Sequence, residues 1–159
     1  MTIEKVVSGG QTGADRAALV AAIALNVPHG GWCPMRRRAE DGPIPPQFKL
    51  KETSTVDYPT RTEWNIRDSD GTVVFTFGPL DGGSALTVRS ALRRQKPCLY
   101  LDLDTIDDAE AAAQVLAFVW KSAIKVLNVA GNRESKAPGI ASRVEKVMTA
   151  VLSAKKEKP

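Results

Sequence analysis

The chain is most constrained by a glycine-rich segment that lies between two apolar segments near its start. The run Ile3–Val7 is short and apolar, residues 8–13 read SGGQTG, and Ala14–Leu25 is rich in alanine, leucine and valine. Glycines let the backbone turn sharply, and a helix that follows such a turn begins with N–H groups that have no partner inside the helix. The segment therefore predicts a strand, a tight turn and a helix, the repeating unit of parallel α/β proteins.

The rest of the chain continues this alternation. Its apolar runs show no polar alternation, as expected for parallel strands that are buried on both faces. We therefore predict a three-layer α/β protein with a parallel sheet of about five strands and helices on both faces. Residues 1–154 are expected to form one domain, and residues 155–159 a disordered basic tail. Further strands are expected within residues 27–33 and at 72–77, 97–101 and 125–130, and helices at 60–68, 84–95, 107–122 and 139–154.

The charge and the cysteines argue against several classes of function. The net charge is +4 over 159 residues. That excess is too small to predict a nucleic-acid partner without a nucleic-acid-binding motif. Cys33 and Cys98 form no C-x-x-C pair, so neither a disulfide framework nor a zinc site is expected. No apolar run approaches the roughly 20 residues that cross a bilayer, and no signal peptide is visible. We therefore expect a cytoplasmic protein with no membrane partner.

The first glycine-rich turn is the strongest candidate for a ligand site. Its glycines would let a ligand approach the backbone closely, and the helix N-terminus behind them attracts anions such as phosphate. The segment lacks the Gly-Lys-Ser/Thr of a P-loop, so ordinary ATPase chemistry is not expected. The alternative is a tight, capped turn that binds no ligand. The candidate residues are Gly9, Gly10, Gln11, Thr12, Gly13 and Asp15.

Two more loops are expected at the same edge of the sheet. Residues 81–84 read DGGS after the strand at 72–77, and residues 131–135 read GNRES after the strand at 125–130. Ligands of open α/β sheets bind at the carboxyl ends of the strands, so we expect these loops to meet the first turn. The alternatives are a second turn without a ligand and a solvated polar loop. The candidate residues are Gly82, Gly83, Ser84, Thr87, Asn132, Arg133 and Ser135.

A long proline-rich segment and the helix after it supply charged candidates. Residues 34–50 contain four prolines, which block regular helix, and loops of this length are often functional. The arginines at 36–38, followed by Glu40 and Asp41, predict either a solvated charge cluster or a lid over an anionic ligand. The candidate residues from this part of the chain are Arg38, Arg61, Glu63 and Asn65, with Glu63 as the acid–base group of an enzyme.

Taken together, these segments resemble the molybdenum cofactor carrier family. The resemblance implies a Rossmann-like fold related to the nucleotide-binding LOG proteins. It also implies a carrier that binds and protects the molybdenum cofactor, a phosphorylated pterin that holds its metal through a dithiolene. A homo-oligomer, either a dimer or a tetramer, is implied too, with molybdoenzymes or cofactor-synthesis proteins as partners. The resemblance covers nearly the whole chain in order, at residues 8–16, 30–34, 38–45, 61–65, 68–72, 82–84, 128–135 and 138–140.

The second turn departs from the LOG pattern P-G-G-x-G-T-x-x-E. Residues 81–87 read DGGSALT and are followed by Val88 and Arg89, so the catalytic glutamate of that pattern has no clear counterpart. We therefore expect a binding protein rather than an enzyme, with the molybdenum cofactor as its anionic small-molecule cargo. The alternative is an enzyme or sensor of the same superfamily that acts on a nucleotide or phosphoribosyl compound.

Overall fold

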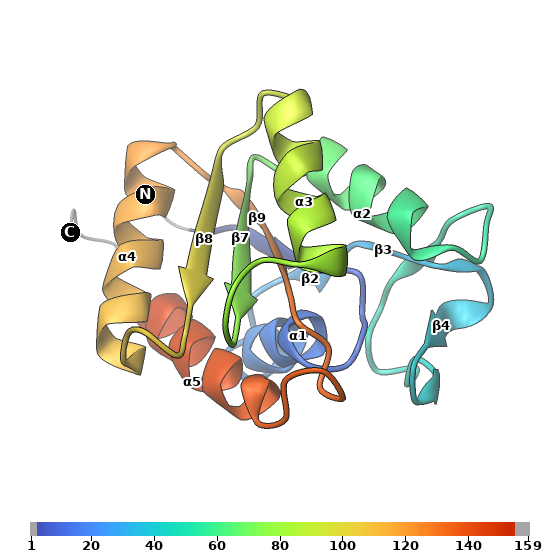
Figure 1. The fold of residues 1–159 in the computed structure, drawn as a ribbon, viewed down its shortest axis with the longest axis horizontal. Coiled ribbons are helices and arrows are strands. Elements are labelled where there is room, and N and C mark those ends of the chain that lie inside the picture. Colours follow the sequence, from blue (N-terminus) through green and yellow to red (C-terminus); the bar gives the residue numbers. More distant parts are fainter. Residues whose placement is uncertain (1–2, 155–159) are drawn as a thin grey trace.

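A parallel sheet of five strands forms the centre of the computed structural model, which describes residues 3–154 (Figure 1). The strands lie in the order β2-β1-β9-β7-β8, and every neighbouring pair is parallel. This confirms the predicted sheet, whereas the tail predicted at residues 155–159 lies outside the described residues. The strands are β1 (Lys5–Val7), β2 (His29–Gly30), β7 (Gly71–Thr76), β8 (Cys98–Asp102) and β9 (Val126–Gly131).

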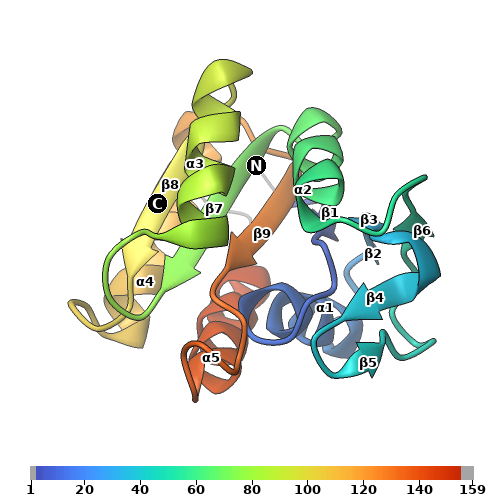
Figure 2. The ribbon, with the colours of Figure 1, turned by 45° about the vertical axis from the view of Figure 1, so that its right-hand side comes forward.

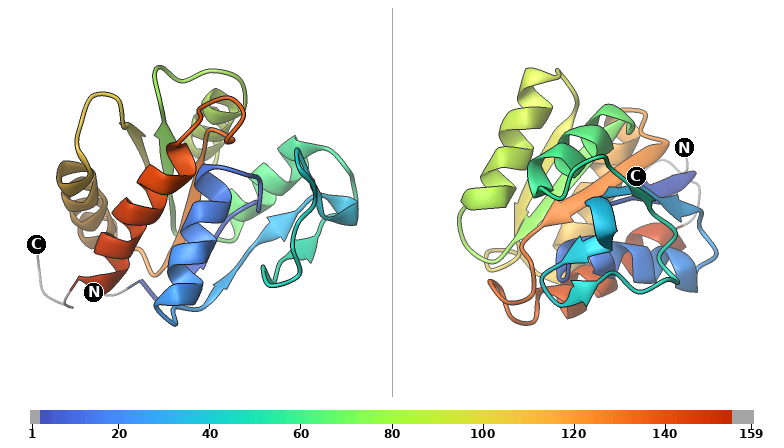
Figure 3. Two further views of the ribbon diagram at one scale, coloured as in Figure 1. Left: turned by 90° about the horizontal axis from the view of Figure 1, so that it is seen from below. Right: turned by 90° about the vertical axis from the view of Figure 1, so that its right-hand side faces the viewer.

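Helices cover both faces of this sheet (Figures 2 and 3). On one face α5 packs between α1 and α4, and on the other α2 packs against α3. The main core lies between the sheet and the first group, where Phe75, Leu127 and Met148 are fully buried. The predicted three-layer, Rossmann-like α/β fold is therefore confirmed. The helices are α1 (Ala14–Ala24), α2 (Tyr58–Arg67), α3 (Gly82–Arg93), α4 (Asp108–Lys121) and α5 (Ile140–Ser153).

The position of β9 shows where a ligand is expected. β1 connects through α1 to β2, which is one edge strand of the sheet, whereas β7 connects through α3 to β8, which is the opposite edge strand. β9 follows the other four strands in the chain and lies between β1 and β7. Open α/β sheets bind ligands at the carboxyl ends of the strands where the connections diverge in this way. The carboxyl ends of β1, β9 and β7 are therefore the expected place for a ligand.

The strand expected within residues 27–33 is divided in two. Gly31 has a φ of +122°, which L side chains rarely adopt, and a Cβ there would collide with the backbone of Ser8. The chain turns at this glycine, so β2 joins the main sheet whereas β3 (Trp32–Cys33) pairs with β6 (Lys51–Glu52) in a separate parallel pair.

The segment predicted to be irregular, residues 34–50, contains short regular elements (Figure 2). Residues 38–43 form a hairpin that lies beside α1. Ile44 and Phe48 pack with Leu19 of that helix in a small second core. Strands of two residues leave no periodic pattern in a sequence, which is why the hairpin was not predicted. The elements are a 3-10 turn (Met35–Arg37) and the antiparallel strands β4 (Arg38–Ala39) and β5 (Gly42–Pro43).

Candidate ligand-binding site

A pocket of about 260 Å³ lies where the first turn, α2, α3 and the loop between β9 and α5 meet. It lies at the carboxyl ends of the strands, as the topology predicts. The predicted candidates that line it are Gln11, Asp15, Arg61, Gly82, Gly83, Ser84, Thr87, Asn132 and Arg133. The lining residues that sequence analysis missed are Tyr58, Pro59, Thr62, Leu86, Ala130, Gly131 and Lys136.

The second turn, residues 82–84, presents open hydrogen-bond donors to this pocket. The backbone N–H groups of Gly82 and Gly83 have no acceptor within the described part of the chain, as is usual for the first residues of a helix. A Cβ placed on Gly83 would meet no atom within 4 Å. Ser84 closes the turn, because its hydroxyl donates to Asp81 O at 2.7 Å and accepts from Asp81 N at 3.2 Å. The turn is thus rigid, and its donors remain accessible.

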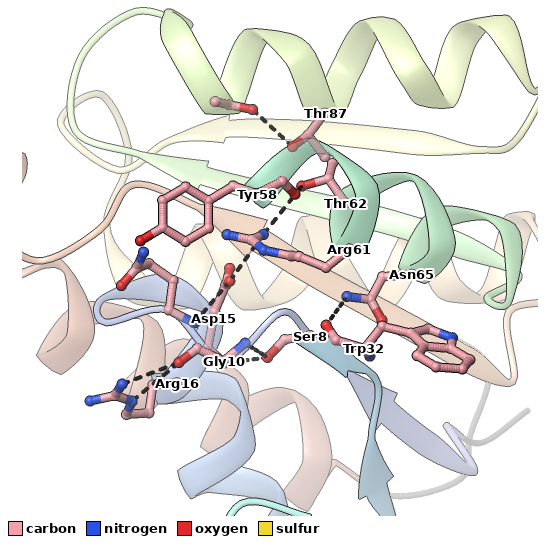
Figure 4. A network of polar contacts seen from close by, with 12 residues as sticks. Ser8, Gly10, Asp15, Arg16, Trp32, Tyr58, Arg61, Thr62, Asn65 and Thr87 are labelled. Atoms are coloured by element: carbon pink, nitrogen blue, oxygen red, sulfur yellow. Dashed lines mark hydrogen bonds and ion pairs between the residues drawn. The ribbon is translucent and has the colours of Figure 1, made fainter. Parts of the chain in front are cut away.

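The side chains of three cationic residues line the pocket, namely Arg61, Arg133 and Lys136. Arg61 is the most enclosed of the three (Figure 4), because its guanidinium lies 5.4 Å from the Tyr58 ring centroid and its Nη1 lies 3.5 Å from Asp15 Oδ2. Its Nε is buried and has no hydrogen-bond partner among the described residues. A buried donor without an acceptor costs free energy. Arg61 therefore supplies a positive charge at the pocket, and its Nε still has a hydrogen bond to donate.

Asp15 is the carboxylate that faces the pocket. Burial raises its pKa above the usual value, while Arg61, the Gln11 N–H and Arg16 counteract only part of that rise. The Gln11 N–H donates to Asp15 Oδ2 at 3.3 Å. The Asp15 carboxylate therefore both neutralises Arg61 and fixes the backbone of the first turn.

The N–H groups of the first turn, residues 8–13, are mostly used by the protein itself. Ser8 N donates to Gly30 O at 3.2 Å, Gly10 N donates to Ser8 Oγ at 3.3 Å, and Thr12 N donates to Gln11 Oε1 at 3.1 Å. Together with the Gln11 N–H, these donors already have acceptors. The first turn consequently offers the pocket the side chains of Gln11 and Asp15 rather than a row of free N–H groups.

The glycines of the first turn make room for other parts of the protein. Gly10 has a φ of +75°, and a Cβ there would lie 2.6 Å from Leu50 Cδ1 and 2.8 Å from Ile44 Cδ1. A Cβ on Gly9 would collide with the Arg61 side chain, and one on Gly13 with the backbone at Asn132. The close backbone approach predicted for a ligand is therefore occupied by the small core and by Arg61.

The β4–β5 hairpin is fastened to the loops around the pocket by Glu40, which lies at its tip. The Glu40 carboxylate accepts hydrogen bonds from the hydroxyls of Thr12 and Ser135, and Arg133 Nε lies 3.5 Å from its Oε2. Although burial opposes ionisation, the hydrogen bonds from Ser135 and Thr12 lower the pKa of Glu40. The neighbouring Asp41 binds both Nη atoms of Arg16, at 2.6 and 3.0 Å. Thr12 and Ser135, predicted as ligand donors, thus bind a carboxylate of the protein.

Glu63, the predicted acid–base group, lies outside the pocket lining. Its Oε1 accepts from Ser90 Oγ at 2.5 Å and from Arg93 Nη2 at 2.6 Å, and its Oε2 accepts from Arg94 Nε at 2.7 Å. Burial opposes ionisation here too, but the bonds from Ser90 and Arg94 lower the pKa of Glu63. In this position the carboxylate joins α2 to α3 rather than facing a ligand.

Asn65 and Arg38 also have structural partners away from the pocket lining. The Asn65 amide exchanges two hydrogen bonds with the backbone of Trp32, at 2.8 and 2.9 Å, and so attaches α2 to β3 (Figure 4). Arg38 donates to Val56 O at 3.0 Å, and its guanidinium lies 4.7 Å from the Tyr58 ring centroid. Arg38 therefore contacts a pocket residue, Tyr58, from outside.

Within residues 3–154, no three His, Cys, Asp or Glu side chains come together as a candidate metal site. Over the same residues, no helix is long and apolar enough to span a membrane. Cys33 is buried in the small core, and burial raises the pKa of the Cys98 thiol to about 11.

The comparisons with known proteins agree with this fold. Residues 6–152 match the circularly permutated YpsA SLOG family, and the chain belongs to that family. A crystal structure from Syntrophus aciditrophicus, described as “Putative molybdenum carrier protein”, is similar with a TM-score of 0.93 and 46% sequence identity over 96% of both chains. A comparison with proteins whose descriptions are curated found no match to this chain.

Proposed function

We propose that this protein binds the molybdenum cofactor, or a similar anionic pterin, by its phosphate and carries it to other proteins. The observation that carries the proposal is the pocket at the second turn, where the free N–H groups of Gly82 and Gly83 lie with the side chains of Arg61, Arg133 and Lys136. Free N–H groups at a helix N-terminus and nearby cations are the groups that bind phosphate in proteins. The name of the Syntrophus aciditrophicus protein supports the choice of ligand.

The size of the pocket limits how such a ligand is held. Its volume of about 260 Å³ lies slightly below the range of roughly 300–1,000 Å³ typical of sites that enclose a small molecule. The phosphate and the groups next to it fit inside, and the rest of a larger ligand extends through the mouth. The cofactor carries its metal on its own dithiolene, so the protein side chains bind the pterin phosphate rather than the metal.

The first test is purification from a host that makes the molybdenum cofactor, followed by measurement of bound molybdenum and extractable pterin. We expect the two in equal amounts in the wild type and lower amounts of both in Arg133→Gln. Arg89→Gln is the matched control, because Arg89 is an exposed cation of α3 outside the pocket lining. A wild-type protein that holds neither component and takes up no added cofactor would contradict the proposal.

A nucleotide or phosphoribosyl compound is the second candidate ligand, and Asp15 is the observation that favours it. Asp15 lines the pocket, and burial raises its pKa above the usual value, which is the direction of shift that favours acid–base work by a carboxyl group. Glu63, by contrast, is held between α2 and α3. A screen of nucleoside monophosphates for release of the base distinguishes the candidates. Release that disappears in Asp15→Asn favours the enzyme, and no release in the wild type removes it.

A further inference from the structure

The loop between β9 and α5, residues 132–139, carries two of the pocket's three cations, and each is paired with a carboxylate from elsewhere in the chain. Lys136 Nζ binds the carboxylate of Asp81, which precedes α3. Arg133 Nε lies 3.5 Å from Glu40 of the hairpin. In this state both positive charges are partly neutralised by the protein's own anions.

The backbone of this loop is held firmly while the two cationic side chains remain exposed. The Glu134 carboxylate accepts from Gly139 N at 2.7 Å and from Ala141 N at 3.0 Å, and Glu134 N donates to Thr12 Oγ1 at 3.1 Å. The side chain of Lys136 is 40% exposed and that of Asp81 is 58% exposed. The Lys136 side chain can therefore change partner without any movement of the loop backbone.

Lys136 is also within reach of the open donors of the second turn. Its Nζ lies 3.6 Å from the position that a Cβ on Gly82 would occupy. An anion bound to the free N–H groups of Gly82 and Gly83 would thus lie beside this ammonium group. Ion pairs between exposed side chains contribute little free energy, so a phosphate group with about two negative charges can displace one carboxylate.

We propose that Lys136 is a ligand-binding residue and that Asp81 is an internal competitor, which holds Lys136 until an anion at the second turn replaces the carboxylate. This inference rests on the proposed function, because it concerns the same pocket. It adds that the affinity for anions is set by an exchange of partners at Lys136. Asp81 therefore lowers the affinity of the site, because its carboxylate is bound to one of the three cations that line the pocket.

The test is titration calorimetry with inorganic pyrophosphate as the probe at constant ionic strength. Asp81→Asn removes the competing charge but keeps a residue that caps a helix well, so we expect the dissociation constant to fall about two- to fivefold. Lys136→Gln removes the cation, and we expect the dissociation constant to rise about tenfold. In the double variant the gain from Asp81→Asn should disappear, because Lys136 is no longer there to be released.

Controls and contrary results separate this inference from the proposed function. Glu145→Gln and Lys146→Gln make the same charge changes at exposed positions of α5 outside the pocket lining, and we expect them to leave binding unchanged. If the wild type binds pyrophosphate and Asp81→Asn binds it equally well or more weakly, the inference is overturned. Affinity unchanged from the wild type in Lys136→Gln also overturns it. Neither result overturns the proposed function. Failure of the wild type and of every variant to bind pyrophosphate overturns the anion site, and with it both proposals.

Discussion

The first and second glycine-rich turns follow the same sequence pattern but have different environments in the structure. Both follow a strand of the main sheet where a helix begins, the first just before α1 and the second in the first residues of α3, and both contain a Gly-Gly pair. Gly9 and Gly10 are buried against Arg61, Ile44 and Leu50, whereas Gly82 and Gly83 are exposed at the pocket. Four of the six backbone N–H groups in residues 8–13 have acceptors among the described residues, whereas the N–H groups of Gly82 and Gly83 have none there.

This difference shows that a Gly-Gly pair in a sequence indicates where a side chain is absent, but not whether the protein or a ligand occupies the space. At the first turn the protein itself fills it, so the glycines stabilise the fold and position Gln11 and Asp15. At the second turn the space is open, so the glycines leave the N–H groups accessible. Substitutions at the first turn should therefore change stability, and substitutions at the second turn should change ligand binding.

The largest expected effect is that of Gly10→Ala on stability. The positive φ of Gly10 is unfavourable for alanine, and the added Cβ lies too close to Leu50 and Ile44. We expect the free energy of unfolding to fall by about 2–4 kcal/mol. Gly83→Ala is the matched change at the second turn, and it should stay within about 0.5 kcal/mol of the wild type. Urea denaturation measures both, and equal losses would remove the distinction between the turns.

Gly83→Val tests the other half of the comparison. The branched side chain would project into open space, so stability should remain close to that of the wild type, but it would crowd a ligand at the Gly82 and Gly83 N–H groups. We expect pyrophosphate to bind at least about tenfold more weakly, equivalent to about 1.4 kcal/mol. Calorimetry measures the affinity and thermal unfolding the stability. Unchanged affinity in this folded variant would place the phosphate elsewhere.

Glu40→Gln tests whether the hairpin supports the first turn through charge. Burial opposes ionisation of Glu40, but its hydrogen bonds lower its pKa below the usual 4.5 in the folded protein. The unfolded chain binds the proton more tightly, so Glu40 stabilises the fold above about pH 4.5, and this contribution is lost as pH falls through the folded pKa. We expect a loss of about 1 kcal/mol at pH 7 and a shallower decline below about pH 4.5. An unchanged pH profile of unfolding would contradict this role.

Ser84→Ala should have the smallest effect. The variant removes the hydroxyl that bonds the Asp81 backbone twice at the start of α3, and we expect a loss of about 0.5–1 kcal/mol. Ser8→Ala should cost more, because Ser8 is buried and its hydroxyl satisfies the Gly10 N–H. A larger loss for Ser84→Ala than for Ser8→Ala in urea denaturation would reverse the contrast between the two turns.

The main elements of the fold could be predicted because apolar runs identify strands that are buried on both faces. The run at residues 72–77 corresponds to β7, and the run at 125–130 corresponds to β9, each within one residue at either end. The hairpin at residues 38–43 could not be predicted, because its position depends on Glu40 and on Ile44. Contacts between residues so far apart in the sequence leave no local pattern.

The candidate site was predictable in its place but not in its details. Parallel strands bring their carboxyl ends to one edge, so the three loops were expected to meet there. Which donors remain free depends on acceptors from distant segments, such as Asn132 O beside Ala14 N. Lys136 lies three residues after Arg133 in a loop at that edge, and this spacing was the signal that could have identified it. Tyr58 and Leu86 line the pocket, but nothing in the sequence distinguishes them from core residues.

The place of β9 in the sheet has a consequence for how the protein is made. β1 leaves the ribosome before β7, but these two strands do not pair with each other, because β9 lies between them in the sheet. Until β9 has been synthesised, each exposes an apolar edge with unpaired backbone groups, a template for association with other chains. The nascent chain therefore depends on β9, which follows the other four strands, to close the sheet, and fragments that end before β9 should aggregate rather than fold.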